Sequence, residues 1–159
     1  MKNSAYPNVV FSAKTMAMAV ALIFGSAGAL AQQSVKLSLN GAAEVPAVST
    51  SASGSGEFWV AADHALSGKF TVSGMSATAA HIHEGAAGKD GPVAIKLVKN
   101  ADGSFAVPPG TKLTDTQYKA LAEGNLYVNV HSADHPGGEI RAQLLTGGAT
   151  ATGMPSSGY

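Results

Sequence analysis

The feature that most constrains this chain is a series of short segments in which apolar and polar residues alternate. The clearest is 139–144, where apolar Ile140, Ala142 and Leu144 follow polar Glu139, Arg141 and Gln143. Such alternation is typical of a β-strand with one face in a core. Seven or eight strand-like segments are separated by Gly, Pro, Asn or Asp. We therefore expect an all-β fold, either an antiparallel β-sandwich or a Greek-key barrel.

One short helix is predicted within this β-rich pattern. The segment 114–117, Thr-Asp-Thr-Gln, matches a capping box, in which the first and fourth side chains bind each other's backbone N–H groups. The helix should run from Asp115 to Glu123 and stop at Gly124, because glycine adopts the left-handed conformation that ends many helices.

Residues 1–31 have the features of a secretory signal peptide. Lys2 and Lys14 are their only charged residues, residues 16–30 are largely apolar, and residues 29–31 read Ala-Leu-Ala. An Ala-x-Ala pattern after such a segment marks a cleavage site. A membrane anchor is the alternative, but the apolar run is shorter than the ~20 residues that span a bilayer. We expect cleavage after Ala31, a periplasmic or secreted protein, and no membrane association after cleavage.

The rest of the chain is compatible with one domain, 32–145, followed by a flexible tail, 146–159, which is poor in large apolar residues. Beyond residue 31, eight basic residues stand against ten acidic ones without a basic stripe, so no nucleic-acid partner is expected. The chain has no cysteine, which excludes thiolate metal sites and cysteine nucleophiles. It also lacks a Gly-x-Ser-x-Gly motif and a glycine-rich phosphate loop, so we assign no catalytic residue.

Three histidines are candidate metal ligands. His81 and His83 flank Ile82 in a strand-like segment, so their side chains should share one face. His131 ends the segment 126–130, and Asn129 and Tyr127 should lie on its face. We expect these imidazoles to meet and bind a transition metal, copper before zinc, since the affinity order favours copper. The alternative is a hydrogen-bonded structural cluster.

Further residues near these histidines have two possible roles each. His135 could be a fourth ligand or an exposed residue of the turn 135–138. Glu84 could accept a hydrogen bond from a ligand histidine or be a surface acid. Glu139 and Arg141 share a strand face and could pair with each other, or Arg141 could offer its positive charge to an anion near the site.

Several motifs together resemble the CHRD domain, a module named after chordin. They cover about 35–145 and are the segments 41–46, 79–85, 91–93, 113–114, 127–132 and 136–144. The two histidine motifs, with Gly-Glu-Ile-Arg after the second, are the most specific. The resemblance implies an exported β-rich domain and no settled activity.

A second, weaker resemblance is to the copper-ligand strands of Cu/Zn superoxide dismutases. The segments 81–84, His-Ile-His-Glu, and 128–131 carry it, and Arg141 lies where those enzymes have an anion-guiding arginine. The loop 85–91 has no bridging histidine, and the chain has no zinc-ligand cluster and no cysteine pair. The resemblance therefore implies a mononuclear copper site rather than dismutase activity.

Three functions are compatible with the sequence. The first is an exported binding module that holds one transition-metal ion, copper favoured, through the histidine cluster. The second is a protein- or polysaccharide-interaction module with structural histidines, whose partner would be an extracellular or periplasmic protein. The third is a copper redox enzyme.

Overall fold

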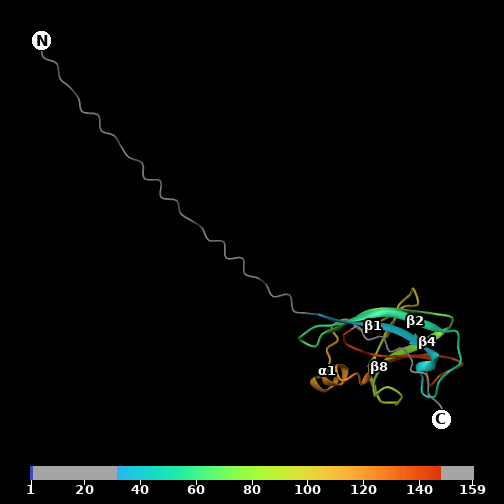
Figure 1. The fold of residues 1–159 in the computed structure, drawn as a ribbon. Helices are drawn as coiled ribbons and strands as arrows, with labels where there is room; N and C mark the ends of the chain where they lie inside the picture. Colours follow the sequence, from blue (N-terminus) through green and yellow to red (C-terminus); the bar gives the residue numbers. More distant parts are fainter. Residues whose placement is uncertain (2–31, 148–159) are drawn as a thin grey trace.

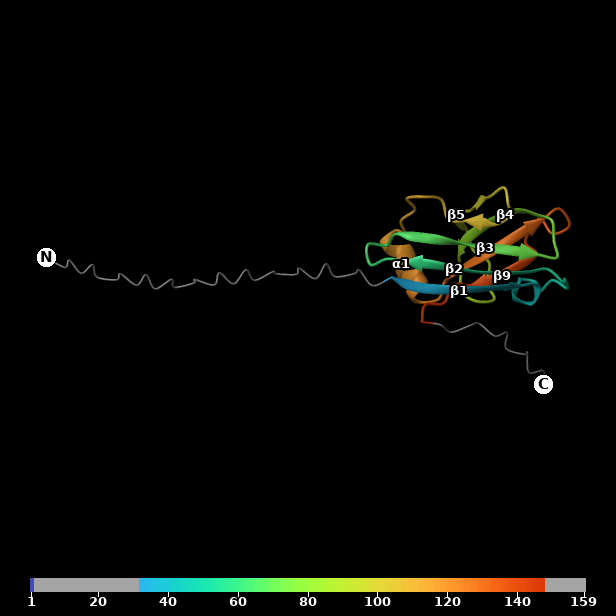
Figure 2. The same cartoon turned by 90° about the horizontal axis from the view of Figure 1, so that it is seen from above.

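The structure is a computed structural model that describes Met1 and residues 32–147. The expected signal peptide, Met1 apart, and all but two residues of the expected tail lie outside these residues. Nine antiparallel strands form one sheet that curls into a nearly closed barrel (Figures 1 and 2), in the order β5-β4-β8-β9-β1-β2-β3-β7-β6. The strands are β1 Gln33–Asn40, β2 Ser53–Val60, β3 Leu66–Ser73, β4 Ala77–Glu84, β5 Val93–Lys96, β6 Val98–Lys99, β7 Phe105–Ala106, β8 Leu126–Ser132 and β9 Ile140–Gln143. The predicted all-β class is confirmed.

The gap in the barrel lies between β5 and β6, which occupy the two edges of the sheet and follow each other in the chain. Leu97 joins them, and its N–H donates to the carbonyl of Ala80 on β4 over 3.0 Å. Residues 93–99 therefore form two separate strands rather than one continuous strand. The chain changes pairing partners at Leu97, and Val93 is left 47% exposed rather than facing a core.

The core fills the inside of the barrel with side chains from alternate strand positions. Val35, Leu37 and Leu39 of β1 are buried, while the residues between them are exposed. Phe58 is buried and its neighbour Trp59 is exposed, as alternation requires. Phe70 and Phe105 stack with ring centroids 5.7 Å apart. The alternating pattern thus fixes which face of each strand turns inward.

The helix α1 spans Asp115–Ala122 and lies at one end of the molecule (Figure 1). The capping box is confirmed: the Gln117 N–H donates to Thr114 Oγ1 at 3.2 Å, and the Thr114 N–H donates to Gln117 Oε1 at 2.9 Å. Gly124 has φ 71° and follows the helix as predicted. Among the described residues, no helix has the length and apolar character needed to cross a membrane.

Removal of the cap should measure its contribution. We expect Thr114→Ala to lower the free energy of unfolding by about 1 kcal/mol, because the Gln117 N–H loses its acceptor. Urea denaturation at pH 7.5 measures the change. Thr116→Ala is the matched control, since Thr116 is exposed in the first turn and caps nothing. An equal loss in both variants would contradict a specific role for the cap.

Candidate metal centre

The outer face of β4, β8 and β9 carries two rows of polar side chains. The register pairs Asn129 of β8 with His81 and with Arg141, which lie on the strands to either side. It pairs Tyr127 in the same way with His83 and with Gln143. These positions alternate with core residues such as Ile82 and Val128, which are fully buried. The core pattern therefore directs both rows to the opposite face of the sheet.

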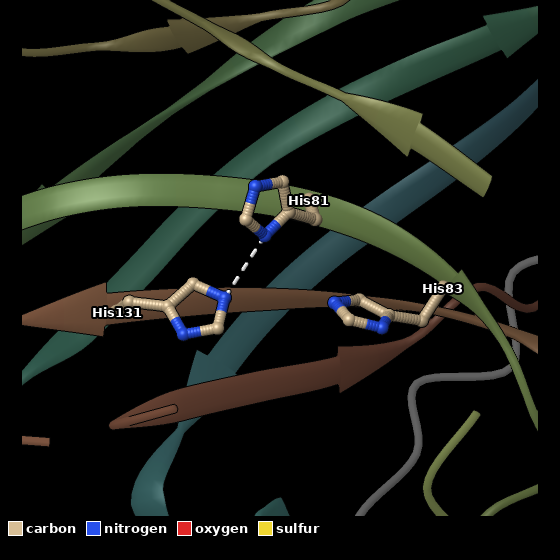
Figure 3. Close-up of side chains that lie close together, drawn as sticks. All are labelled: His81, His83 and His131. Atoms are coloured by element: carbon tan, nitrogen blue, oxygen red, sulfur yellow. Dashed lines mark hydrogen bonds between the residues drawn. The ribbon is translucent and has the colours of Figure 1, made fainter. Parts of the chain in front are cut away.

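The structure brings His81, His83 and His131 together on this face. Their side chains point toward one another from β4 and β8 (Figure 3), and one nitrogen from each lies within 4.8 Å of the others. The ring centroids are 4.9 Å apart for His81 and His131, and 5.7 Å for His81 and His83. The prediction that the three imidazoles meet is confirmed.

Backbone carbonyls set the tautomers of two of these imidazoles. Nδ1 of His83 lies 2.9 Å from the carbonyl oxygen of Gly91, and Nδ1 of His131 lies 2.9 Å from that of Pro136. A carbonyl oxygen only accepts hydrogen bonds, so each Nδ1 must carry the proton. In the neutral rings, Nε2 of His83 and Nε2 of His131 are therefore unprotonated, and each carries a lone pair.

The Nε2 atom of His83 is buried and has no hydrogen-bond partner. A buried polar atom without a partner costs roughly 1–3 kcal/mol. Nε2 of His131 lies 3.0 Å from Nδ1 of His81, so in the metal-free protein His81 donates there. His81 can release that contact by carrying its proton on the other ring nitrogen instead. Three lone pairs can then face one point.

The surroundings favour the neutral form of the two histidines on β4. Burial lowers the pKa of His81, and the neighbouring His131 and His83 lower it further. Burial also lowers the pKa of His83, against the opposing effect of the Gly91 carbonyl. Neutral imidazole is the form that coordinates a metal ion. Both side chains are therefore held in a state ready for ligation at neutral pH.

Tyr127 forms one wall of this cluster. Its ring stacks on that of His83, with centroids 4.9 Å apart and planes 9° apart. The guanidinium carbon of Arg141 lies 3.3 Å from the centroid of the same ring. Since His83 and Arg141 lie on the strands to either side of β8, they flank Tyr127 from opposite sides. This three-layer stack restrains the His83 ring.

Arg141 is only 1% exposed and does not take either role expected from the sequence. Its Nη2 donates to the carbonyls of Ala86 at 3.2 Å and Lys89 at 2.8 Å, and its Nη1 lies 3.5 Å from Asp90 Oδ1. The predicted pairing with Glu139 is wrong, because Glu139 instead accepts a hydrogen bond from Thr50. The guanidinium holds the loop 85–91 and is not presented to an external anion.

The same loop is held at two further points. Gln143 Nε2 donates to the carbonyl of Gly85 at 2.8 Å, and the Gly91 N–H donates to the Tyr127 hydroxyl at 3.1 Å. The Gly91 carbonyl is the acceptor that orients His83. Side chains of β8 and β9 thus position the backbone group that sets the His83 tautomer.

A family model described as the CHRD domain matches residues 35–144. The chain belongs to the CHRD domain family. All three clustered histidines and the residues that orient them lie within the matched part of this CHRD domain. No curated protein and no solved structure matches the chain significantly.

The CHRD domain places His135 and Glu84 outside the group of three. The His135 N–H donates to Ser132 Oγ at 3.1 Å, in the turn that follows β8. The role of His135 as a fourth metal ligand stays a prediction. Glu84 ends β4, and within residues 32–147 no hydrogen bond joins it to the three histidines. The ring N–H groups of His83 and His131 instead donate to the backbone carbonyls of Gly91 and Pro136. Sequence reasoning missed these acceptors because the direction of a carbonyl depends on the conformation of its loop.

A buried carboxyl lies beside this site and was also missed. Glu44 is 7% exposed, and its Oε1 accepts a 2.8 Å hydrogen bond from Nδ2 of Asn129. Burial raises the pKa of the Glu44 carboxyl to about 7, although the positive charge of Arg141 acts in the opposite direction. A Cβ at Gly138 would collide with both side chains, so glycine is required there. The CHRD motif at 41–46 was the only sequence feature that included Glu44.

This buried acid should make the metal-free protein less stable at alkaline pH. Its folded-state pKa is about 7 against an ordinary value of 4.5, so ionisation costs nothing below pH 4.5 and the full amount above pH 7. Glu44→Gln keeps an acceptor for Asn129 and cannot ionise. We expect it to raise the free energy of unfolding by about 2–3 kcal/mol at pH 8 and to change it little at pH 4.5.

Urea denaturation at the two pH values measures this effect. Glu123→Gln is the matched control, because the Glu123 side chain is 51% exposed beside Lys119 on α1. It should show no comparable gain at pH 8. A Glu44→Gln protein that is as stable as the parent at both pH values would contradict the raised pKa.

Proposed function

We propose that this CHRD domain is exported and binds one transition-metal ion, with copper favoured, through His81, His83 and His131. The observation that carries the proposal is Nε2 of His83, a buried lone pair that is aimed at two other imidazoles and has no partner. A metal ion would satisfy it. The signal-peptide features of residues 1–31 support export to the periplasm or beyond the cell.

The surroundings of the ligands support this reading. Metal-ligating histidines usually donate their second ring N–H to a carbonyl or carboxylate, which fixes the ring and its tautomer. His83 and His131 do so through Gly91 and Pro136. A set of imidazoles suits copper and zinc, and the affinity order of divalent ions places copper above zinc. Copper is therefore the favoured ion and zinc the second candidate.

A structural role for the histidines is the competing proposal. The 3.0 Å contact between Nδ1 of His81 and Nε2 of His131 supports it, because it shows that two of the rings can satisfy each other without a metal. In that case the domain would be an interaction module, and an outer sheet face would bind an exported protein or a polysaccharide. This alternative leaves the buried Nε2 of His83 without an explanation.

Copper binding should depend on pH in a defined direction. We expect the mature domain, residues 32–159, to retain one copper ion per chain at pH 7.5. Protons compete for the ring nitrogens, so binding should weaken as pH falls. The pKa values of His81 and His83 are lowered, so most of the loss should occur below the ordinary imidazole value of about 6.5.

Elemental analysis after gel filtration at pH values between 8 and 4 measures the bound copper, and a parallel series with zinc tests the choice of ion. A chain that retains no metal at pH 7.5 would favour the structural alternative. Retention that is unchanged down to pH 4 would contradict ligation by imidazole.

A further inference from the structure

Asn129 lies among the three candidate ligands without being one of them. It is on β8, directly opposite His81 in the register and two residues before His131 on the same face. Its side chain is 4% exposed. An amide buried in this position is costly unless both of its ends are hydrogen-bonded.

Only one end of this amide has a partner. Nδ2 donates to Glu44 Oε1 at 2.8 Å, whereas Oδ1 is buried and unpartnered. In the described part of the chain, Asn129 Oδ1 and His83 Nε2 are the two buried side-chain polar atoms that lack a partner. Both belong to neighbouring residues of one site. A single occupant of that site could therefore satisfy both.

An amide oxygen accepts hydrogen bonds and donates none, and beside three imidazoles it is a poor ligand for copper or zinc, so the partner that suits Oδ1 is a hydrogen-bond donor. Nε2 of His83 and Nε2 of His131 cannot serve, since their protons are on Nδ1. A metal ion alone would satisfy His83 but would offer Oδ1 no proton. Water bound to the ion would offer one, and sites with three protein ligands commonly hold water in the remaining position.

We propose that the bound metal ion carries a solvent molecule, and that Asn129 Oδ1 accepts a hydrogen bond from it. This inference rests on the metal site proposed above. Glu44 holds Nδ2 and so turns the amide oxygen toward the solvent. Asn129 is then a positioning residue for the exchangeable ligand. Asn129 favours metal-bound ligands that can donate a hydrogen bond to Oδ1, such as water or hydroxide, over anions that have no hydrogen to donate.

Azide tests this preference, because it binds copper(II) but has no proton to donate. In the parent, azide must displace the water and leave Oδ1 buried without a donor, which lowers affinity. Asn129→Leu has a similar volume and no such oxygen. We expect azide to bind the copper(II)-loaded Asn129→Leu protein about 10-fold more tightly than the parent. The azide-to-copper charge-transfer absorption measures the two dissociation constants.

Asn125→Leu is the matched control. Its side chain hydrogen-bonds to Glu123 away from the histidines, so its azide affinity should equal that of the parent. Copper content, measured by elemental analysis, separates the two proposals. If the parent loads no copper, the metal site and this inference both fail. If parent and Asn129→Leu each load one copper ion but bind azide equally, only the inference fails.

A crystal structure of the copper-loaded parent provides a test that does not depend on the variant folding. We expect a solvent oxygen bound to copper and within about 3.2 Å of Asn129 Oδ1. Direct ligation of copper by Oδ1 would overturn the inference. A hydrogen bond to Oδ1 from the carboxyl O–H of Glu44 in place of the solvent would also overturn it.

Discussion

Replacement of His83 with alanine should abolish stoichiometric copper binding. The Gly91 carbonyl sets the tautomer of the His83 ring, which leaves a buried lone pair on Nε2 without a partner. Alanine at position 83 removes this lone pair from the site. Two imidazoles would remain, and these already contact each other. We expect bound copper to fall from one ion per chain to a background value. Elemental analysis after gel filtration measures this directly.

Two other variants make this result interpretable. His131→Ala should cause a similar loss, and it removes a ring that does not stack on Tyr127, so it tests ligation apart from packing. His64→Asn is the control, because asparagine tolerates the positive φ of 67° at this position. His64 stacks on Tyr118 of α1 and does not belong to the group of three histidines. The His64→Asn protein should keep one copper ion. Full copper retention by His83→Ala, with thermal unfolding near that of the parent, would refute the proposed site.

Replacement of Arg141 with methionine should strongly destabilise the protein. The variant loses two charge-assisted hydrogen bonds to the carbonyls of Ala86 and Lys89, and the stack on Tyr127. Hydrogen bonds to charged groups contribute about 1.5–3 kcal/mol each, so we expect a loss of about 3–5 kcal/mol in the free energy of unfolding. Urea denaturation of the metal-free protein at pH 7.5 measures it.

The same variant should also bind copper about 10- to 100-fold more weakly, the usual cost of losing a group that orients a ligand. Its loop 85–91 would no longer hold the Gly91 carbonyl against His83. Lys89→Met is the matched control, because it removes a positive charge from the exposed side of the same loop and leaves the backbone acceptor in place. Equal stability of the two variants would show that the buried guanidinium does not hold the loop.

The features that the sequence predicted well are local ones. His81 and His83 share a face because side chains alternate along a strand, and Ile82 between them enters the core. The helix after Thr114 follows from a capping box whose two hydrogen bonds join residues three positions apart. Both features depend on residues that lie close together in the chain and on the regular geometry of strands and helices. The spacing of residues in the sequence is therefore enough to predict them.

Features that depend on contacts between distant segments were decided only by the tertiary structure. The sequence placed Arg141 on an outer strand face, where an arginine is normally exposed, but the loop 85–91 folds over that face and buries it. The hydrogen bond between Asn129 and Glu44 joins residues 85 positions apart. The tautomer of His83 depends on the direction of one carbonyl, at Gly91, and the side chains of Tyr127, Arg141 and Gln143 set the course of its loop. Alternation along a strand decides which face a side chain takes, but what covers that face depends on how the loops pack in the folded chain.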